Sequence, residues 1–267
     1  MTLGVSMGRM HLFELEDQPW FPRLIRAYMQ DHLRFMGDWS GPAYQGFVEK
    51  LKAALERVGQ REILDLCSGG GGPVKIILQK LQAQGVAVTA RLTDLYPNTE
   101  AYEQLERESG GTIQGHSSPV NAINVPPELN GFRLMANGFH HFRPEDARMV
   151  LADAVTKQRS IAVIEMVSRS VLAFVSVGIG FLAVFIATPF VKPFRLSRLL
   201  FTYVLPVMPL CVLWDGLVSC LRVYSPDELR TLVSRLGYTE YDWDIGRLRT
   251  GPSAATYLIG TPRLANG

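Results

Sequence analysis

Apolar and polar positions along the chain predict helices and strands in alternation. Residues 22–36 and 44–58 repeat apolar side chains at the spacing of one helical face, and the apolar run 62–66 leads directly into glycines. Further on, the pattern predicts helices over 73–84, 98–109, 144–158 and 225–236, and strands over 86–93, 132–136, 160–166, 238–244 and 255–260. Strands that alternate with helices are typical of a mostly parallel sheet covered on both faces, so we expect an α/β fold.

One long stretch of the sequence has almost no charge. Residues 170–221 hold four charged side chains in 52 residues, namely Lys192, Arg195, Arg198 and Asp215. Its uncharged first part reaches the length of about 20 residues that a membrane-spanning helix needs. The stretch therefore stands apart from the rest of the chain.

Three interpretations of residues 170–221 are open. A spanning hairpin would carry Lys192, Arg195 and Arg198 to the far side of the membrane, against the positive-inside tendency. A hairpin that enters one leaflet, with these basic residues at the lipid headgroups, fits better. The third interpretation is a soluble lid or a dimer surface, and the sequence does not predict the oligomeric state. We expect contact with a membrane surface.

The overall composition excludes several classes of protein. The 267 residues include 27 Lys and Arg against 25 Asp and Glu, and a net charge of +2 is too small to indicate nucleic-acid binding. Three cysteines without a CxxC pair predict neither a disulfide framework nor a zinc site, so we expect no metal. The N-terminus lacks the apolar core of a signal peptide, which favours a cytoplasmic location, peripheral or monotopic at the inner face of the membrane at most.

The sharpest local motif is EILDLCSGGGGP, residues 62–73, in which a strand turns into a helix through glycines. Such a turn lets the backbone approach a ligand closely, although glycines alone would also suit a simple turn. Asp65 stands at the strand end, where its carboxylate can receive an ammonium group. Asp94 follows 29 residues later, where an acid can bind both ribose hydroxyls. The two acids predict a site for a nucleoside that carries a cationic amino acid.

This motif resembles motif I of the class I S-adenosylmethionine-dependent methyltransferases that act on small molecules, usually an acid followed by G-x-G-x-G. Cys67 stands at the first glycine position and departs from the family pattern. The resemblance implies a Rossmann-like fold with a seven-stranded sheet, and S-adenosyl-L-methionine as the cofactor. The cofactor-binding residues that it implies are Asp65, Cys67, Ser68, Gly69, Gly70, Gly71, Asp94, Leu95, Asn121, Ala122 and Asn137.

The resemblance extends beyond the glycine motif, over about residues 60–166 and 222–262. The segment 119–126 resembles the one that bonds the adenine amino group, with Asn121 where Asp is more usual; an amide oxygen can still accept that bond. The implied division of the chain is an N-terminal helical cap over 1–58, a cofactor-binding domain over 59–166 and 222–267, and a hydrophobic insertion over 167–221.

Candidate catalytic residues follow the fourth and fifth predicted strands. The run NGFHHF, residues 137–142, resembles the paired-histidine segment of many such methyltransferases, and strand ends form the ligand crevice in this architecture. His140 or His141 could therefore accept a proton from the acceptor, or both could merely cap the next helix or pack against adenosine. Glu165 could orient a substrate group or pair with Arg169.

Candidate substrate residues lie outside the motifs. Trp20 and Phe21 could form a wall of the pocket or a hydrophobic staple onto the core. Asp215 is the only acid of the apolar stretch and must find a partner. Arg222 is nearest in sequence, so Asp215 could pair with it, or Asp215, Arg222 and Tyr224 could contact the substrate.

The predicted function is methyl transfer to a small, lipophilic acceptor, with oxygen or nitrogen favoured as the acceptor atom and carbon possible. The alternative is a protein that binds S-adenosylmethionine for structural or non-methylating use. An NAD-linked oxidoreductase is disfavoured, because the Asp65 carboxylate ahead of the glycines would repel a pyrophosphate.

Overall fold

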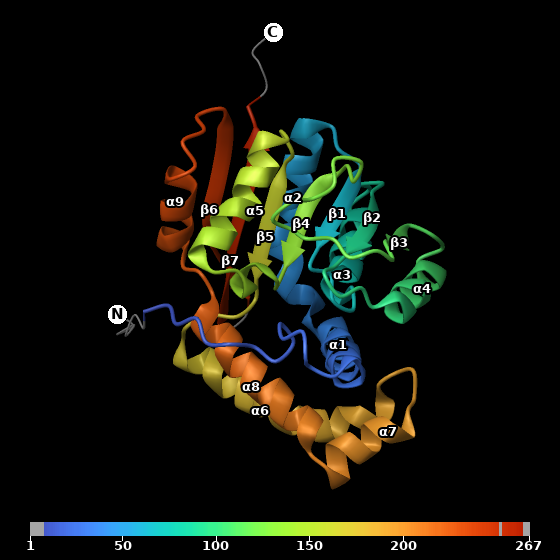
Figure 1. Cartoon of the computed structure of the whole chain (residues 1–267). Coiled ribbons are helices and arrows are strands. Elements are labelled where there is room, and N and C mark those ends of the chain that lie inside the picture. Colours follow the sequence, from blue (N-terminus) through green and yellow to red (C-terminus); the bar gives the residue numbers. More distant parts are fainter. Residues whose placement is uncertain (1–7, 251–252, 264–267) are drawn as a thin grey trace.

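Across residues 8–250 and 253–263, which the computed structural model describes, seven strands form one sheet in the order β3-β2-β1-β4-β5-β7-β6. β7 is antiparallel to both neighbours and the other pairs are parallel, which confirms the predicted mostly parallel sheet (Figure 1). The strands are β1 (Glu62–Leu66), β2 (Thr89–Thr93), β3 (Ile113–Gly115), β4 (Phe132–Ala136), β5 (Ile161–Glu165), β6 (Tyr241–Thr250) and β7 (Ser253–Pro262).

Helices cover both faces of the sheet. Side chains alternate between the faces of a strand, so in β1 Ile63 packs on one side while Leu64 and Leu66 pack on the other. The first face is covered by α2 (Gln45–Val58), α3 (Gly72–Ala83) and α4 (Thr99–Glu108), and the second by α5 (Pro144–Thr156) and α9 (Pro226–Ser234). Helix α2, which the sequence assigned to the cap, thus packs on the sheet.

The structure differs from the predicted elements at the edges of the sheet. Strand β3 was not predicted, because three residues are too few to show a periodicity. β2 begins at Thr89 instead of Val86, and β6 and β7 are longer than expected. Gly251 and Pro252, a turn-forming pair between the last two strands, lie outside the described residues.

A separate group of helices lies against the carboxyl ends of the strands (Figure 1). It consists of α6 (Val171–Ala187), η3 (Thr188–Phe190), α7 (Leu196–Leu199), η4 (Leu200–Val204) and α8 (Val207–Arg222), and we call it the helical layer. Helix α1 (Arg23–Gly37) lies between this layer and the sheet, and η1 (Asp38–Tyr44) joins α1 to α2. Phe21 and Met29 pack against Val184 and Met208, so the layer is attached to the body through an apolar contact.

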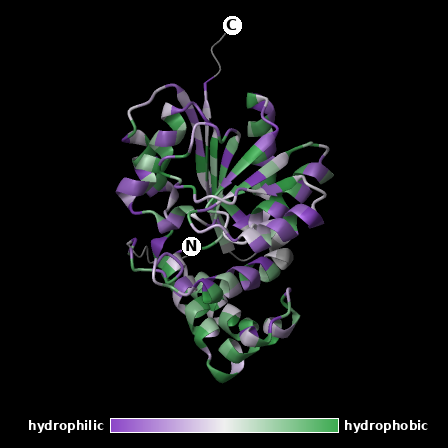
Figure 2. Cartoon of the chain, turned by 45° about the vertical axis from the view of Figure 1, so that its right-hand side comes forward, coloured by the Kyte–Doolittle hydropathy of each residue, from purple (hydrophilic) through white to green (hydrophobic). Residues whose placement is uncertain are grey.

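The helical layer consists largely of apolar residues (Figure 2), and many of them are exposed. The segment Val171–Phe190 is long and apolar enough to cross a membrane, and Leu196–Val204 with Val207–Arg222, bent by 74°, passes the same test as a pair. Ile179 is 62% exposed and Ile186 is 74% exposed. Apolar side chains therefore face outward along the whole of α6.

The basic residues of the layer are not all at its surface. Arg198 is buried, forms an ion pair with Asp31 of α1 and donates to the carbonyl oxygens of Val191 and Pro193. Arg195 pairs with Glu100 of α4. The expectation that three basic residues face lipid headgroups is therefore wrong for Arg198, because the buried carboxylate of Asp31 holds its guanidinium.

Replacing Gly71 by alanine should lower the free energy of unfolding by about 3 kcal/mol. Gly71 has φ of 73°, and a Cβ there would lie 2.5 Å from the Cδ1 atom of the fully buried Leu105. Gly110→Ala is the matched control, since Gly110 has φ of 59° but an added Cβ would meet nothing within 4 Å. The Gly110→Ala change should lower the free energy of unfolding by about 1 kcal/mol. Urea unfolding measures both, and equal losses would contradict the close packing at Gly71.

Candidate cofactor and acceptor site

The loop between β1 and α3 is fixed by its neighbour β2. The Ser68 N–H donates to the carbonyl of Thr93 at 3.0 Å, and the Ser68 hydroxyl donates to the carbonyl of Asp65 at 3.0 Å. Cys67, at the position that departs from the family pattern, has φ of 58°, and Gly69 has φ of 52°. A non-glycine residue in the left-handed region is uncommon and is often found at functional sites.

Asp94 joins the segments that the sequence assigned to the cofactor. Its Oδ2 atom accepts from the Gly69 N–H at 2.8 Å, and its carbonyl oxygen accepts from the Val120 N–H at 2.8 Å. The loop, the second acid and the segment 119–126 therefore lie together. Leu95 is exposed beside Asp94 and Ala122 is buried, whereas the Asn121 Oδ1 atom accepts from the N–H of Ile123 within its own turn.

Asp65 is a buried acid at the end of β1, 3% exposed. Burial raises its pKa to about 7, with the Ser68 hydrogen bond opposing and the Asp94 charge reinforcing this shift. Burial makes the carboxylate form costly, and a cationic partner beside it would offset this cost and stabilise the charged form. This environment fits the ammonium group of an amino-acid ligand.

Besides Gly71, two further glycines of the motif are in close contact with the protein. A Cβ at Gly70 would lie 3.1 Å from the carbonyl oxygen of Gln30, and one at Gly72 would lie 3.1 Å from Cα of Arg34. Both neighbours belong to α1, which lies directly on the loop. At Gly69 the nearest atom, on Gln30, would be 3.8 Å away, so this glycine leaves more room.

A cavity of about 450 Å³ lies between the glycine loop, α1 and the helical layer. This volume is within the usual range for small-molecule sites. One part of its wall is polar and includes Cys67, Ser68, Asn137, His140 and His141, and another is apolar and includes Met29, Leu33, Met36, Val177 and Val212. The predicted loop, the histidine segment and the apolar stretch thus meet at one cavity.

Asn137 and Glu165 fix the backbone at the ends of β4 and β5. Asn137 has φ of 58°, accepts from the Met166 N–H at 2.7 Å and donates to the hydroxyl of Tyr44 at 3.1 Å. Glu165 Oε1 accepts from the N–H groups of Phe139 and His140, at 2.7 and 3.0 Å. These bonds shape η2 (Phe139–His141), the turn that carries both histidines.

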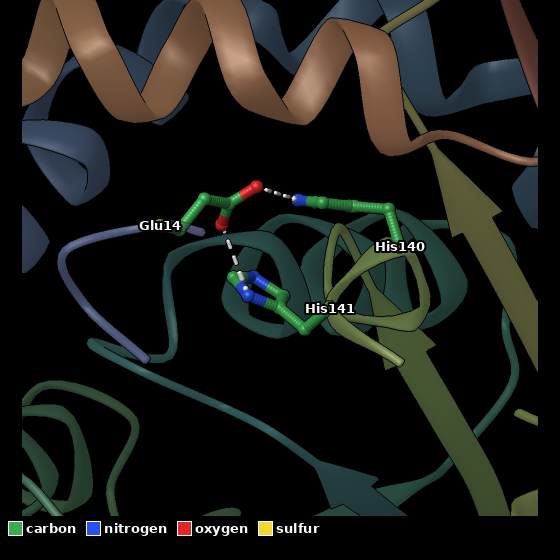
Figure 3. Close-up of side chains that lie close together, drawn as sticks. All are labelled: Glu14, His140 and His141. Atoms are coloured by element: carbon green, nitrogen blue, oxygen red, sulfur yellow. Dashed lines mark ion pairs between the residues drawn. The ribbon is translucent and has the colours of Figure 1, made fainter. Parts of the chain in front are cut away.

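His140 is oriented by Glu165. Its Nδ1 atom lies 2.7 Å from Glu165 Oε2, and both side chains are buried. A carboxylate can only accept, so Nδ1 donates this hydrogen bond. Nε2 lies 3.6 Å from Glu14 Oε1 (Figure 3), and His140 lines the cavity.

The same nitrogen of His141 contacts two carboxylates. Its Nδ1 atom lies 3.0 Å from Glu14 Oε2 (Figure 3) and also 2.7 Å from Asp17 Oδ1, which the figure does not draw. Burial lowers the pKa of His141, but the charges of Glu14 and Asp17 outweigh this and raise it to about 10. His141 is therefore a cation at neutral pH and is unsuited to accept a proton.

Arg222 supplies the second positive charge of this cluster. It is 1% exposed, and its Nη1 atom lies 2.6 Å from Asp17 Oδ2 and 3.3 Å from Glu14 Oε1. Its Nε atom donates to the His140 carbonyl at 3.2 Å. Ligand atoms of Glu14, His140 and His141 lie within 4.8 Å of one another and could hold a metal ion. Because Arg222 already pairs with Glu14, we interpret the cluster as an ion-pair network.

The expected partners of two acids differ in the structure. Asp215 lines the cavity and accepts from the N–H groups of Leu15 and Glu16, at 2.7 and 3.1 Å. The expected pair of Asp215 with Arg222 is therefore wrong, because Arg222 pairs with Glu14 and Asp17. Glu165 likewise bonds to His140, while Arg169 pairs with Glu228.

The aromatic candidates lie outside the cavity wall. Trp20 is 67% exposed, whereas Phe21 is 5% exposed and packs with Ile25 and Val184, as a staple onto the core would. Tyr224 donates to the carbonyl of Phe142 at 2.8 Å.

The sequence did not single out Glu14, Asp17 or Tyr44. The acidic run 14–17 was visible, but its partner Arg222 is about two hundred residues away.

Comparison with solved structures finds the same fold in methyltransferases. Plantazolicin methyltransferase in complex with SAH is 10% identical, with 93% of each chain covered and a TM-score of 0.55. Human N-acetylserotonin methyltransferase in complex with SAM is 12% identical, with 90% of this chain and 56% of that chain covered and a TM-score of 0.51. An O-methyltransferase family protein from Burkholderia thailandensis is 15% identical, with 85% and 58% covered and a TM-score of 0.47.

The similarities to the plantazolicin and human enzymes, with TM-scores of 0.55 and 0.51, support the fold. The chain has the Rossmann-like fold of class I methyltransferases, and it spans a little over half of the length of the human and Burkholderia proteins (56% and 58%). No protein-family model matches the sequence, and no curated protein matches it.

Replacing Asp17 by asparagine should lower the pKa of His141 from about 10 by one unit or more, because a carboxylate at hydrogen-bond distance is lost. The pH dependence of the His141 side-chain signals in NMR spectra measures this change. Asp227→Asn, on the exposed start of α9, is the control and should leave that pKa unchanged. An unshifted His141 in the Asp17 variant would contradict the proposed ion-pair network.

Proposed function

We propose that the chain is an S-adenosylmethionine-dependent methyltransferase that acts on a small, lipophilic acceptor. The observation that carries this proposal is the His140–Glu165 pair, which faces a cavity at the carboxyl ends of β4 and β5 beside the glycine loop. Ligands of open α/β sheets bind in that crevice. The pair offers a proton acceptor at the place where the cofactor would meet the acceptor.

The residues around the glycine loop fit this cofactor. Asp65 would bind the ammonium group of its amino-acid portion, Asp94 the ribose, and residues 119–122 would lie at the adenine. The buried Asp65 with its raised pKa supports the first assignment, and the hydrogen bond between Asp94 and Gly69 supports the second. When bound, S-adenosylmethionine supplies an electrophilic methyl group. Human N-acetylserotonin methyltransferase, which has a similar fold, was solved with SAM.

His140 then acts as the general base. Its Nε2 atom accepts the proton of the acceptor's hydroxyl or amine, while Nδ1 stays bonded to Glu165, whose negative charge stabilises the imidazolium. Glu165 is itself held by the N–H groups of Phe139 and His140. Oxygen or nitrogen is favoured as the acceptor atom, because both can lose a proton to a histidine. Carbon is the third option.

The cavity wall supports a lipophilic acceptor. Met29, Leu33 and Met36 from α1, with Val177 and Val212 from the helical layer, give it an apolar surface. Methionine side chains adapt to ligands of different shape. Water excluded by this surface cannot compete with the acceptor for His140.

His140→Ala and Glu165→Gln should each lower the rate of methyl transfer by a factor of about 10² to 10⁴, while the affinity for S-adenosylmethionine stays unchanged. The rate is measured with methyl-labelled cofactor and a lipid extract, and the affinity by calorimetry. Glu145→Gln, an exposed change on α5, is the control. Cofactor binding without any labelled product would favour the alternative, a protein that uses S-adenosylmethionine without transferring its methyl group. Binding of NAD alone would refute both.

We further propose that the outer side of the helical layer enters one leaflet of a membrane, at its cytoplasmic face. The apolar outer surface of α6 supports contact with lipid, since such patches on soluble monomers are rarely so extensive. The inner side of α6 lines the cavity at Val177 and packs on the body at Val184. A helix attached along one side cannot cross the bilayer by itself, so surface insertion is favoured over a span.

Replacing Ile179 and Ile186 together by aspartate should release the protein from membranes, because both side chains leave water when the layer inserts. Flotation with vesicles of phosphatidylcholine and phosphatidylglycerol measures this. Met149→Asp, at a 46% exposed position on α5, is the control and should still float. A wild-type protein that is soluble without detergent and does not float would make the layer a lid or a dimer surface.

A further inference from the structure

The inner side of α6 carries a row of small residues with one gap. Ala173, Val184 and Ala187 are buried, and Val177 and Gly180 of the same helical face line the cavity. Residues spaced by three or four share one side of a helix, so all five face the body of the protein. Gly180 is the one member of this row without a side chain.

Space around this row differs between neighbouring positions. At Gly216 of α8 an added Cβ would lie 2.9 Å from Cγ1 of Val177, so the two helices are in close contact there. One turn further along α6, a Cβ at Gly180 would meet nothing within 4 Å. The cavity thus has unfilled room at Gly180, beyond the point where α6 and α8 touch, and we call this room the gap.

This room lies away from the polar end of the cavity. Arg222, at the carboxyl end of α8, donates to the His140 carbonyl, whereas Gly216 and Val212, earlier in the same helix, line the cavity together with Gly180 of α6. Val212 is ten residues from Arg222 on α8, which corresponds to about 15 Å of helix. A ligand that reaches both ends must therefore be elongated, with a polar head and an apolar tail.

We propose that the gap at Gly180 is a binding site for the hydrocarbon tail of an amphiphilic acceptor, and that the size of residue 180 limits the length of that tail. The proposal rests on the proposed function only for the identity of this ligand as the methyl acceptor. A side chain at position 180 would fill the gap and leave the polar end of the cavity unchanged.

The test uses 4-n-alkylphenols with tails from ethyl to dodecyl as probes, bound to the full-length protein with and without S-adenosylhomocysteine and measured by calorimetry. Wild-type affinity should rise about fourfold per added methylene until the gap is full. Gly180→Leu should weaken binding of the long members at least about tenfold, the effect of losing two or more buried methylenes. It should leave the ethyl member unchanged, and Gly180→Ala should lie between.

Gly178→Leu is the matched control, because Gly178 also has nothing within 4 Å of an added Cβ but does not line the cavity. It makes the same change to α6 and should bind the whole series as the wild type does. Equal affinities of Gly180→Leu and the wild type for the long alkylphenols would overturn the proposal. The same loss of affinity in Gly178→Leu would also overturn it, and so would a wild-type affinity that does not depend on tail length.

Failure of this proposal and failure of the proposed function give different results. One outcome is that neither the wild type nor the variants bind S-adenosylmethionine, while Gly180→Leu still binds the long alkylphenols more weakly than the wild type does. The gap is then a lipid-tail site in a protein that is not a methyltransferase. If methyl transfer is observed and the limit does not move, the function stands and the tail site is refuted.

Discussion

The arrangement of the site depends on the ion pairs and the hydrogen bond that the buried Arg222 guanidinium makes. A buried cation must be paired, and removing its partners would leave an uncompensated charge in a medium of low dielectric constant. Arg222 comes from the helical layer, its carboxylates come from the N-terminal segment at Glu14 and Asp17, and the carbonyl of His140 belongs to η2. Three segments far apart in sequence are therefore joined at one ion-pair network, which places the layer over the ends of the strands.

This network also separates the roles of the adjacent histidines. His141 has the carboxylates of Asp17 and Glu14 at 2.7 and 3.0 Å from Nδ1 and holds a proton, whereas His140 bonds to Glu165 at 2.7 Å through Nδ1 and has Glu14 at 3.6 Å from Nε2. The two rings are stacked, with centroids 4.4 Å apart, so the difference arises from the carboxylate that each Nδ1 atom meets, Glu165 for His140 and Asp17 for His141. In the proposed function, His140 is the histidine whose Nδ1 is held by a buried carboxylate, Glu165, that stabilises the charge it gains.

The sequence predicted the sheet and the glycine loop well because both depend on local patterns. Periodic apolar residues define β1 and α3, and the turn between them needs residues that tolerate positive φ, as at Gly69 and Gly71. Partners of buried charges could not be predicted in this way. Nearness in sequence suggested Arg222 for Asp215, but the structure satisfies Asp215 with two backbone N–H groups of the N-terminal segment. Such choices depend on tertiary contacts that no local pattern encodes.

Helix α6 combines two requirements that usually belong to different helices. A helix that is apolar all round is normally buried on every side, yet Ile179 and Ile186 of α6 are largely exposed. Its inner side forms part of the cavity wall at Val177 and Gly180. If the outer side lies in lipid, as we propose, a lipophilic acceptor passes from the leaflet to His140 along apolar surface. The same helix then accounts for both the unusual composition of the stretch and the selection of an apolar acceptor.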